Sequence, residues 1–237
     1  MITAHTPERI RYAVAIVGAE IDRQLSTDIP EPWTEARLWN ELACCVLSSQ
    51  VPYPTALAAA ARLEASGLLL DVPLTPAALE RALSELLRIP FEIDGGLRRY
   101  RFPDSRARQL TATVLKVRRQ SGGLRDLLNG FGDIELARAW FVEHAPGLGP
   151  KQASMFLRNV GASYDLAVLD RHVINYMMIV GLTTDPSPVR RMADYRRDET
   201  ILRDHAADFG LPVGFLDWAV WIVMRVARPK AAREYMQ

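Results

Sequence analysis

The heptapeptide Ala145-Pro146-Gly147-Leu148-Gly149-Pro150-Lys151 lies between two stretches with helical patterns, residues 133–144 and 151–160. Two glycines around one apolar residue allow a tight turn with close backbone approach, and the leucine can pin the two helices together. The second helix begins with N–H groups that have no partner inside the helix, which favours binding of a phosphate. The segment therefore predicts a helix, a hairpin and a second helix over residues 133–160.

Two other interpretations of this segment stay open. Gly147 and Gly149 could begin a dinucleotide-binding fingerprint, but that motif follows a strand, whereas a helix precedes these glycines. The segment could also be a plain helical turn without a ligand.

Helical signals also dominate the rest of the chain. Apolar residues recur at a spacing of three to four from about Glu35 to Ser49, and Thr75-Pro76 is a typical helix start. Thr55 is expected to cap an alanine-rich helix, and only Tyr164–Leu169 has an extended pattern. We therefore predict an all-α fold with short connections.

Composition excludes several classes of protein. The 237 residues are 49% hydrophobic and 24% charged, which is typical of a globular chain. No apolar run reaches the roughly 18 residues of a membrane span, and from the charged N-terminal residues we expect no signal peptide. Cys44 and Cys45 are adjacent, too few for a zinc or iron–sulfur site, and are interpreted as buried apolar residues. The expected compartment is the reducing cytoplasm.

Charge is unevenly distributed, although the formal net charge is only +1. Between residues 98 and 119 the chain has eight basic side chains against one acidic side chain, Asp104. This pattern favours an anionic partner such as nucleic acid, while a solvated helix face is the alternative. The basic residues are Arg98, Arg99, Arg101, Arg106, Arg108, Lys116, Arg118 and Arg119.

Lys151 and Asp170 are the candidate catalytic residues. Lys151 is one of three lysines in a chain with 26 arginines, so a lysine here indicates an amine that can lose its proton and attack carbon. Asp170 follows nineteen residues later, after the apolar run Leu166–Leu169, which should be buried. Its simpler interpretation is a helix N-cap, and one carboxylate can serve both purposes.

This combination resembles the helix-hairpin-helix DNA glycosylases of the endonuclease III superfamily. Their hairpin reads Pro-Gly-x-Gly-x-Lys, with an aspartate about nineteen positions later, as at Pro146–Lys151 and Asp170. Within the superfamily the likeness is greater to the archaeal-type (type 2) 8-oxoguanine DNA glycosylase/lyases. It is carried by Tyr100–Ala107, Lys151–Ser154, Phe156–Gly161, Asp170–His172, and Leu216-Asp217 with Trp221.

The resemblance implies two helical lobes with the active site in the cleft between them. Residues 36–165 would form a six-helix barrel that contains the helix-hairpin-helix at 133–160, and residues 1–35 with 166–237 would form the second lobe. No metal and no cofactor are implied, since no cysteine follows Cys45 to hold an iron–sulfur cluster. At most a monovalent cation would bind at the hairpin. The expected partner is double-stranded DNA containing a damaged base, bound by a monomer without any membrane.

The resemblance also implies roles for individual residues. Lys151 would attack the sugar C1′ and Asp170 would stabilise the positive transition state. Trp221 would stack on the extruded base while Asp217 bonds its edge, although a tryptophan at helical spacing with Leu216 could equally belong to the core. DNA contacts are implied for Gly147, Leu148, Gly149, Arg171 and Gln50, which would fill the gap left by the base, with further backbone contacts from Arg98, Arg99 and Arg101.

Two departures from the family pattern bear on the substrate. Family members commonly end in a lysine whose terminal carboxylate reads the damaged base, whereas seven residues follow Lys230, the aligned lysine of the base pocket. Leu47-Ser48-Ser49-Gln50 is similar instead to the loop of endonuclease III.

The expected function is a bifunctional DNA glycosylase/AP lyase that excises 8-oxoguanine in base excision repair through a lysine Schiff base. The alternatives are a glycosylase for another modified base and a non-catalytic helix-hairpin-helix DNA-binding protein. The non-catalytic protein would tolerate Lys151→Arg.

Overall fold

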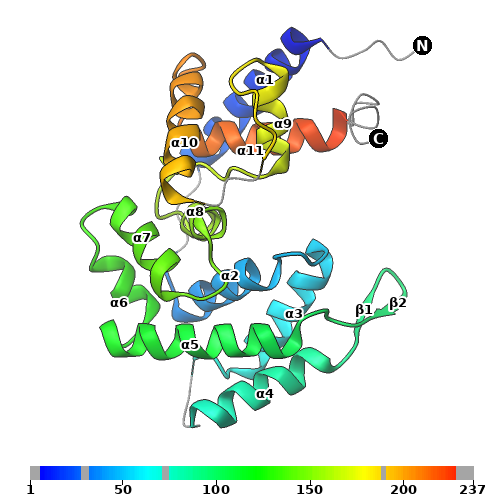
Figure 1. The fold of residues 1–237 in the computed structure, drawn as a ribbon, viewed down its shortest axis with the longest axis vertical. Helices are drawn as coiled ribbons and strands as arrows, with labels where there is room; N and C mark the ends of the chain where they lie inside the picture. Colours follow the sequence, from blue (N-terminus) through cyan, green and yellow to red (C-terminus); the bar gives the residue numbers. More distant parts are fainter. Residues whose placement is uncertain (1–5, 28–31, 71–74, 188–190, 228–237) are drawn as a thin grey trace. The chain divides into compact units, whose positions relative to one another are not determined.

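The computed structural model describes residues 6–27, 32–70, 75–187 and 191–227, and they are mostly helical (Figure 1). The predicted all-α fold is confirmed, with one small β-hairpin added. The chain divides into two compact units, Glu31–Ala162 and Met1–Pro30 with Ser163–Gln237. They are called the hairpin unit and the terminal unit below, and each is described by itself.

The hairpin unit is built around one buried helix, α2. Eight of its residues are buried, and it packs against α3, α5, α6 and α8. The elements of the unit are α2 (Glu35–Leu47), α3 (Tyr53–Ser66), α4 (Pro76–Arg88), β1 (Phe91–Ile93), β2 (Gly96–Arg98), α5 (Pro103–Ser121), α6 (Leu124–Asn129), α7 (Ile134–His144) and α8 (Pro150–Asn159).

Helix starts follow the sequence signals at some positions and differ at others. Thr75 caps α4 and Asp133 caps α7, as their side-chain oxygens accept N–H bonds from the first turns. The prediction for Thr55 is wrong, because α3 already begins at Tyr53 and the Thr55 N–H bonds the carbonyl of Pro52. Pro54 lies within the first turn, where its missing N–H costs nothing, so the helix starts earlier.

Two elements of this unit were missed in the sequence. The β1–β2 hairpin turns at Asp94 and Gly95, both with positive φ, but strands of three residues leave little alternation to read. Helix α6 is only six residues long, and Glu35 caps its start from a distant part of the chain. The Glu35 carboxylate accepts bonds from Leu124 N at 3.0 Å and Arg125 N at 2.7 Å.

The helices of the terminal unit pack around one apolar core. It contains α1 (Pro7–Thr27), α9 (Arg171–Ile179), α10 (Met192–Ala207) and α11 (Val213–Ala227), with α11 packed against the other three helices. Gly214 at the start of α11 donates its N–H to the Tyr164 carbonyl at 2.8 Å, where a Cβ would lie only 2.9 Å from that oxygen. None of the described helices is both long and apolar enough to cross a membrane.

Candidate functional site

The predicted hairpin connects α7 and α8 in the structure. Gly147 has φ +97°, and a Cβ there would lie 2.7 Å from Gln109 Oε1 and 3.3 Å from Val46 Cγ1. Only glycine satisfies both the backbone conformation and the space. Leu148 is 3% exposed and packs inward, as expected for the residue that joins the two helices. Its N–H donates to the Ala145 carbonyl at 3.0 Å.

Lys151 is the second residue of α8, directly after the hairpin. Gly149 is the extended N-cap and Pro150 occupies the first helical position, so the first-turn N–H groups of α8 lie at the hairpin. The Lys151 side chain is half-buried. An amine at the start of a helix, next to first-turn N–H groups, can combine nucleophilic chemistry with phosphate binding.

The two cysteines lie on α2 in the same unit. Burial raises the pKa of Cys44 to about 12, and the charge of Glu41 acts in the same direction. Burial and Glu41 also raise the pKa of Cys45 well above its usual value, while Lys151 acts in the opposite direction. Both thiols therefore stay protonated near neutral pH and offer no nucleophile.

Asp170 is the N-cap of α9 in the terminal unit. Its Oδ1 accepts bonds from His172 N at 2.7 Å and Val173 N at 3.0 Å. Both bonds end on Oδ1, so the cap does not use Oδ2. The N-cap interpretation is thus realised, and among the described residues no hydrogen bond to the second carboxylate oxygen is seen.

Three buried side chains hold the extended segment before Asp170. Glu199 Oε1 accepts the Ala167 N–H at 2.7 Å, and the Tyr195 hydroxyl accepts the Leu169 N–H at 2.9 Å while donating to the Ala167 carbonyl at 2.7 Å. The third is Asp217, whose Oδ2 accepts the N–H of Val168. Exposed fractions of Tyr195, Glu199 and Asp217 are 0%, 1% and 1%. Sequence reasoning missed Tyr195 and Glu199, because nothing local links α10 to this segment.

The other predicted residues of the terminal unit lie at its helix starts or along α11. Arg171 is exposed at the first position of α9, and His172 is half-buried beside it. Trp221 is half-buried, with the Arg225 guanidinium 4.4 Å from its ring centre. Lys230 lies outside the described residues.

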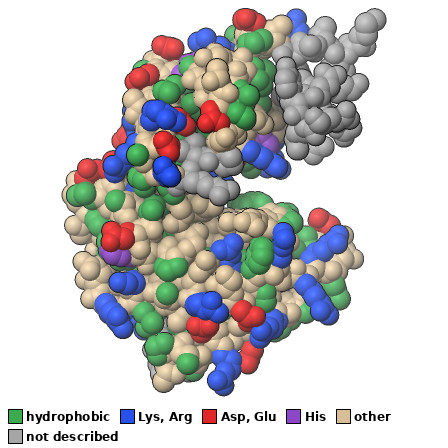
Figure 2. Space-filling view, viewed as in Figure 1, with side chains coloured by type: hydrophobic (Ala, Val, Ile, Leu, Met, Phe, Trp, Pro, Cys, Tyr) green, Lys and Arg blue, Asp and Glu red, His purple; other side chains and the backbone are tan. Residues whose placement is uncertain are grey.

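The basic segment 98–119 divides into exposed and engaged side chains. Arg98, Arg99 and Arg101 are exposed. Arg106 is 8% exposed, and Arg118 donates to the Leu70 carbonyl at 2.7 Å. Basic side chains are distributed over the visible face of the hairpin unit (Figure 2). The three arginines expected to contact the DNA backbone are therefore all exposed, whereas Arg106 is not.

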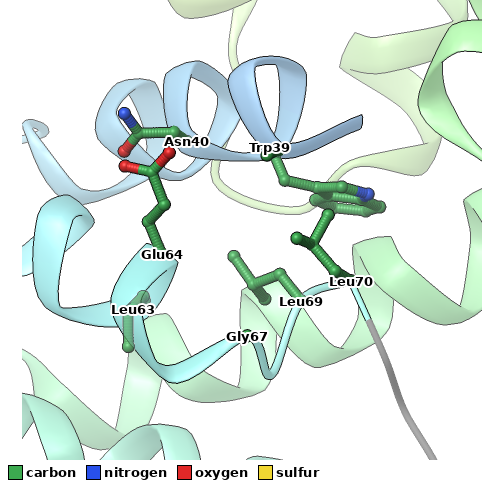
Figure 3. A pocket seen from close by; sticks show the side chains of 8 residues that line it. Trp39, Asn40, Leu63, Glu64, Gly67, Leu69 and Leu70 are labelled. Carbon is green, nitrogen blue, oxygen red and sulfur yellow. The ribbon is translucent and has the colours of Figure 1, made fainter. Parts of the chain in front are cut away.

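An apolar pocket in the hairpin unit is separate from these residues. Trp39, Leu63, Leu69 and Leu70 line it, and Asn40 and Glu64 point toward each other at its rim (Figure 3). None of the residues predicted to act on DNA lines this pocket. Over the described residues, no group of three or more His, Cys, Asp or Glu side chains could hold a metal ion.

The structure places the predicted residues in two sets. Gln50, Gly147, Leu148, Gly149 and Lys151 belong to the hairpin unit. The set in the terminal unit consists of Asp170, Arg171, Asp217 and Trp221. A helical fold with this hairpin and lysine defines the helix-hairpin-helix class of DNA-repair proteins.

Comparison with known proteins identifies the family within this class to which the chain belongs. The Ogg-HhH family model, described as 8-oxoguanine DNA glycosylase, matches residues 26–211, and the chain belongs to this family. A relative from Sulfurisphaera tokodaii is 30% identical over 77% of this chain and 80% of its own length. One from Korarchaeum cryptofilum is 32% identical over 52% of this chain, and the match spans only 57% of that relative. Both are named 8-oxoguanine DNA glycosylase/AP lyase.

Solved structures agree with this fold. The 8-oxoguanine DNA glycosylase of Thermotoga maritima has a TM-score of 0.60 at 30% identity, covering 90% of this chain and 89% of its own. The Methanocaldococcus jannaschii 8-oxoguanine DNA glycosylase has a TM-score of 0.67 at 24% identity, covering 90% and 91%. The second likeness supports the fold alone.

Proposed function

We propose that this protein is a bifunctional DNA glycosylase/AP lyase that removes 8-oxoguanine from double-stranded DNA in base excision repair. Membership of the Ogg-HhH family and the names of the relatives support this activity. The observation that carries the proposal is the placement of Lys151 at the start of α8, directly after the hairpin. An arginine would suffice there for phosphate binding, but it could not form a Schiff base.

The proposed reaction begins with DNA held by its backbone. The hairpin and the first turn of α8, with Gly147, Leu148 and Gly149, hold phosphates without reading sequence, although the Leu148 N–H is engaged by the Ala145 carbonyl. Arg171 and the exposed arginines Arg98, Arg99 and Arg101 add charge. The damaged nucleotide leaves the stack at a cost of a few kcal/mol, and Gln50 fills the gap.

Covalent chemistry then follows at the extruded nucleotide. The neutral Nζ of Lys151 forms a bond to C1′ as the glycosidic bond breaks, and the base leaves with the electron pair and takes up a proton. Loss of the amine proton and opening of the sugar ring give a Schiff base, whose C2′ proton is removed as the 3′ phosphate departs. The Asp170 carboxylate stabilises the positive charge on the sugar and transfers protons.

Base recognition is proposed for Trp221, by stacking, and for Lys230. Asp217 is included in this pocket by resemblance, although its Oδ2 is engaged by the Val168 N–H.

We propose a monomer that works in the cytoplasm at the nucleoid. It would use no cofactor beyond at most a monovalent cation at the hairpin.

Borohydride trapping tests this proposal. A duplex with one 8-oxoguanine is incubated with the wild type, Lys151→Gln and Lys151→Arg, and Lys116→Gln is the matched control because Lys116 is an exposed lysine on α5. We expect a covalent adduct with the wild type and the control, and none with either Lys151 variant. An adduct only with an abasic duplex would retain the lysine chemistry and reject 8-oxoguanine as the substrate. DNA binding without any adduct would instead indicate a non-catalytic binding protein.

A further inference from the structure

Gln50 is held in an unusual backbone conformation. Its φ is +61°, in the left-handed region, and its side chain is exposed in the middle of the loop between α2 and α3. A non-glycine residue is disfavoured in this region, because its Cβ comes too close to the following carbonyl oxygen. Such a conformation persists only where the surroundings determine the loop, so the contacts around Gln50 indicate how it is fixed.

Two buried side chains fix the backbone just before Gln50. The Tyr100 hydroxyl donates to the Leu47 carbonyl at 2.7 Å, and Arg106 Nη2 donates to the Ser49 carbonyl at 2.9 Å. Tyr100 is 5% exposed and Arg106 is 8% exposed. The carbonyls at the end of a helix have no partner inside it, and a positive charge is favourable there. These two donors therefore determine the path of the chain into Gln50.

Arg106 makes a second connection, toward the hairpin. Its Nη1 donates to Gln109 Oε1 at 2.7 Å, and this oxygen would lie 2.7 Å from a Cβ at Gly147. Gln109 therefore lies directly against the hairpin glycine. One guanidinium thus links the loop that carries Gln50 to the hairpin that is proposed to hold phosphate.

Burying the charged side chain of Arg106 costs desolvation free energy. Its Nε has no hydrogen-bond partner among the described residues, although the side chain is almost fully buried. A buried charge of this kind adds little net stability compared with a well-packed apolar side chain. Its geometry, with Nη2 on the Ser49 carbonyl and Nη1 on Gln109, which in turn lies against Gly147, fits a positioning role better than a stabilising one.

We propose that Arg106 is a positioning residue for base displacement. It holds Gln50 at a fixed position relative to the phosphate-binding hairpin. This inference rests on the proposed function of Gln50 as the residue that fills the gap. Arg106 does not touch the DNA. Its loss lets the loop relax out of the left-handed conformation, so the gap is filled more slowly and the base returns to the stack.

The test compares variants that keep the fold. Arg106→Met preserves the buried volume without the donors, and Tyr100→Phe removes only the bond to Leu47. Arg108→Met is the matched control, since Arg108 is exposed on the same helix and its nearest carboxylate, Glu80, is 3.6 Å away at the surface. Thermal unfolding and circular dichroism establish that each variant is folded before its activity is compared.

Single-turnover excision is measured on two duplexes. In one, 8-oxoguanine is paired with cytosine, and in the other it lies opposite a stable abasic analogue, so that displacement costs less. Because the charge-assisted bonds that hold the loop are lost, we expect Arg106→Met to slow excision of the paired base by roughly 10- to 100-fold. On the unpaired base the expected loss is less than about threefold, because displacement no longer limits the reaction.

A double variant tests whether Arg106 acts through Gln50. If it does, Arg106→Met combined with Gln50→Ala is no slower than Gln50→Ala alone. Equal slowing of Arg106→Met on both duplexes, or full additivity with Gln50→Ala, would overturn the proposal. Tyr100→Phe should show the same preference for the unpaired base, with a smaller loss on the paired one.

A binding assay keeps this inference separate from the proposed chemistry. If the wild type excises no 8-oxoguanine, the substrate assignment fails, and the loop is tested with an abasic-site duplex that carries 2-aminopurine opposite the abasic position. We expect the wild type and Arg108→Met to change the 2-aminopurine fluorescence on binding, and Arg106→Met to bind with a much smaller change. An identical change with Arg106→Met would reject the positioning role.

Discussion

The extended segment before Asp170 depends on the hydroxyl of Tyr195. This hydroxyl accepts the Leu169 N–H at 2.9 Å and donates to the Ala167 carbonyl at 2.7 Å. Tyr195 and Ala167 are both 0% exposed, and Leu169 is 6% exposed. Tyr195→Phe would therefore leave one N–H and one carbonyl buried without their partner, while the aromatic packing is kept.

The expected loss of stability can be worked from these two bonds. A buried polar group left without its partner costs about 1–3 kcal/mol, so two groups give about 2–4 kcal/mol after partial relaxation. In a chain of this length, 1 kcal/mol corresponds to roughly 2–4 °C in Tm. Tyr195→Phe should thus lower the melting temperature by about 4–16 °C.

Urea unfolding and native-state hydrogen exchange measure this effect. Tyr12→Phe is the matched control, because Tyr12 is 70% exposed on α1 and loses the same hydroxyl. We expect the control to change the free energy of unfolding by less than about 0.5 kcal/mol. In Tyr195→Phe the amides of residues 167–169 should exchange faster, and excision should slow because Asp170 follows this segment. A loss of stability no larger than that of Tyr12→Phe would refute the reasoning.

Three further predictions concern other parts of the molecule. Asp170→Asn should keep the cap on α9, with stability within about 0.5 kcal/mol of wild type in urea, yet reduce excision by at least about 100-fold, because the charge is lost. Gly123→Ala should destabilise the hairpin unit by about 1–2 kcal/mol in thermal unfolding, since its Cβ would lie 2.6 Å from Glu35 Oε1, part of the carboxylate that caps α6. Burial lowers the pKa of His205 below its usual 6.5, so the unfolded chain takes up the proton first. Stability should therefore be full above about pH 6.5 and fall as the pH decreases through that value, and His205→Gln should flatten this dependence in urea titrations.

Local chemistry let the sequence predict the helical class and the hairpin. Caps at Thr75 and Asp133, and glycine at 147, act within a few residues, so their signals are present in the sequence itself. Asp170 as an N-cap was predictable for the same reason. The choice of lysine at position 151 in an arginine-rich chain indicated chemistry without any structure.

Tertiary structure alone decided which side chains hold the site. Glu35 caps a helix 89 residues away. Tyr195 and Glu199 lie on α10 and accept N–H bonds from the extended segment before Asp170. In the sequence, Arg106 is part of a basic run that is expected to face DNA. In the structure it is buried, and its Nη1 and Nη2 donate hydrogen bonds to Gln109 and to the Ser49 carbonyl. Such bonds depend on which helices pack together, and packing is set by the whole apolar core rather than by neighbouring residues. The sequence therefore determined which reactive groups this chain carries, and its tertiary packing decided how those groups are held.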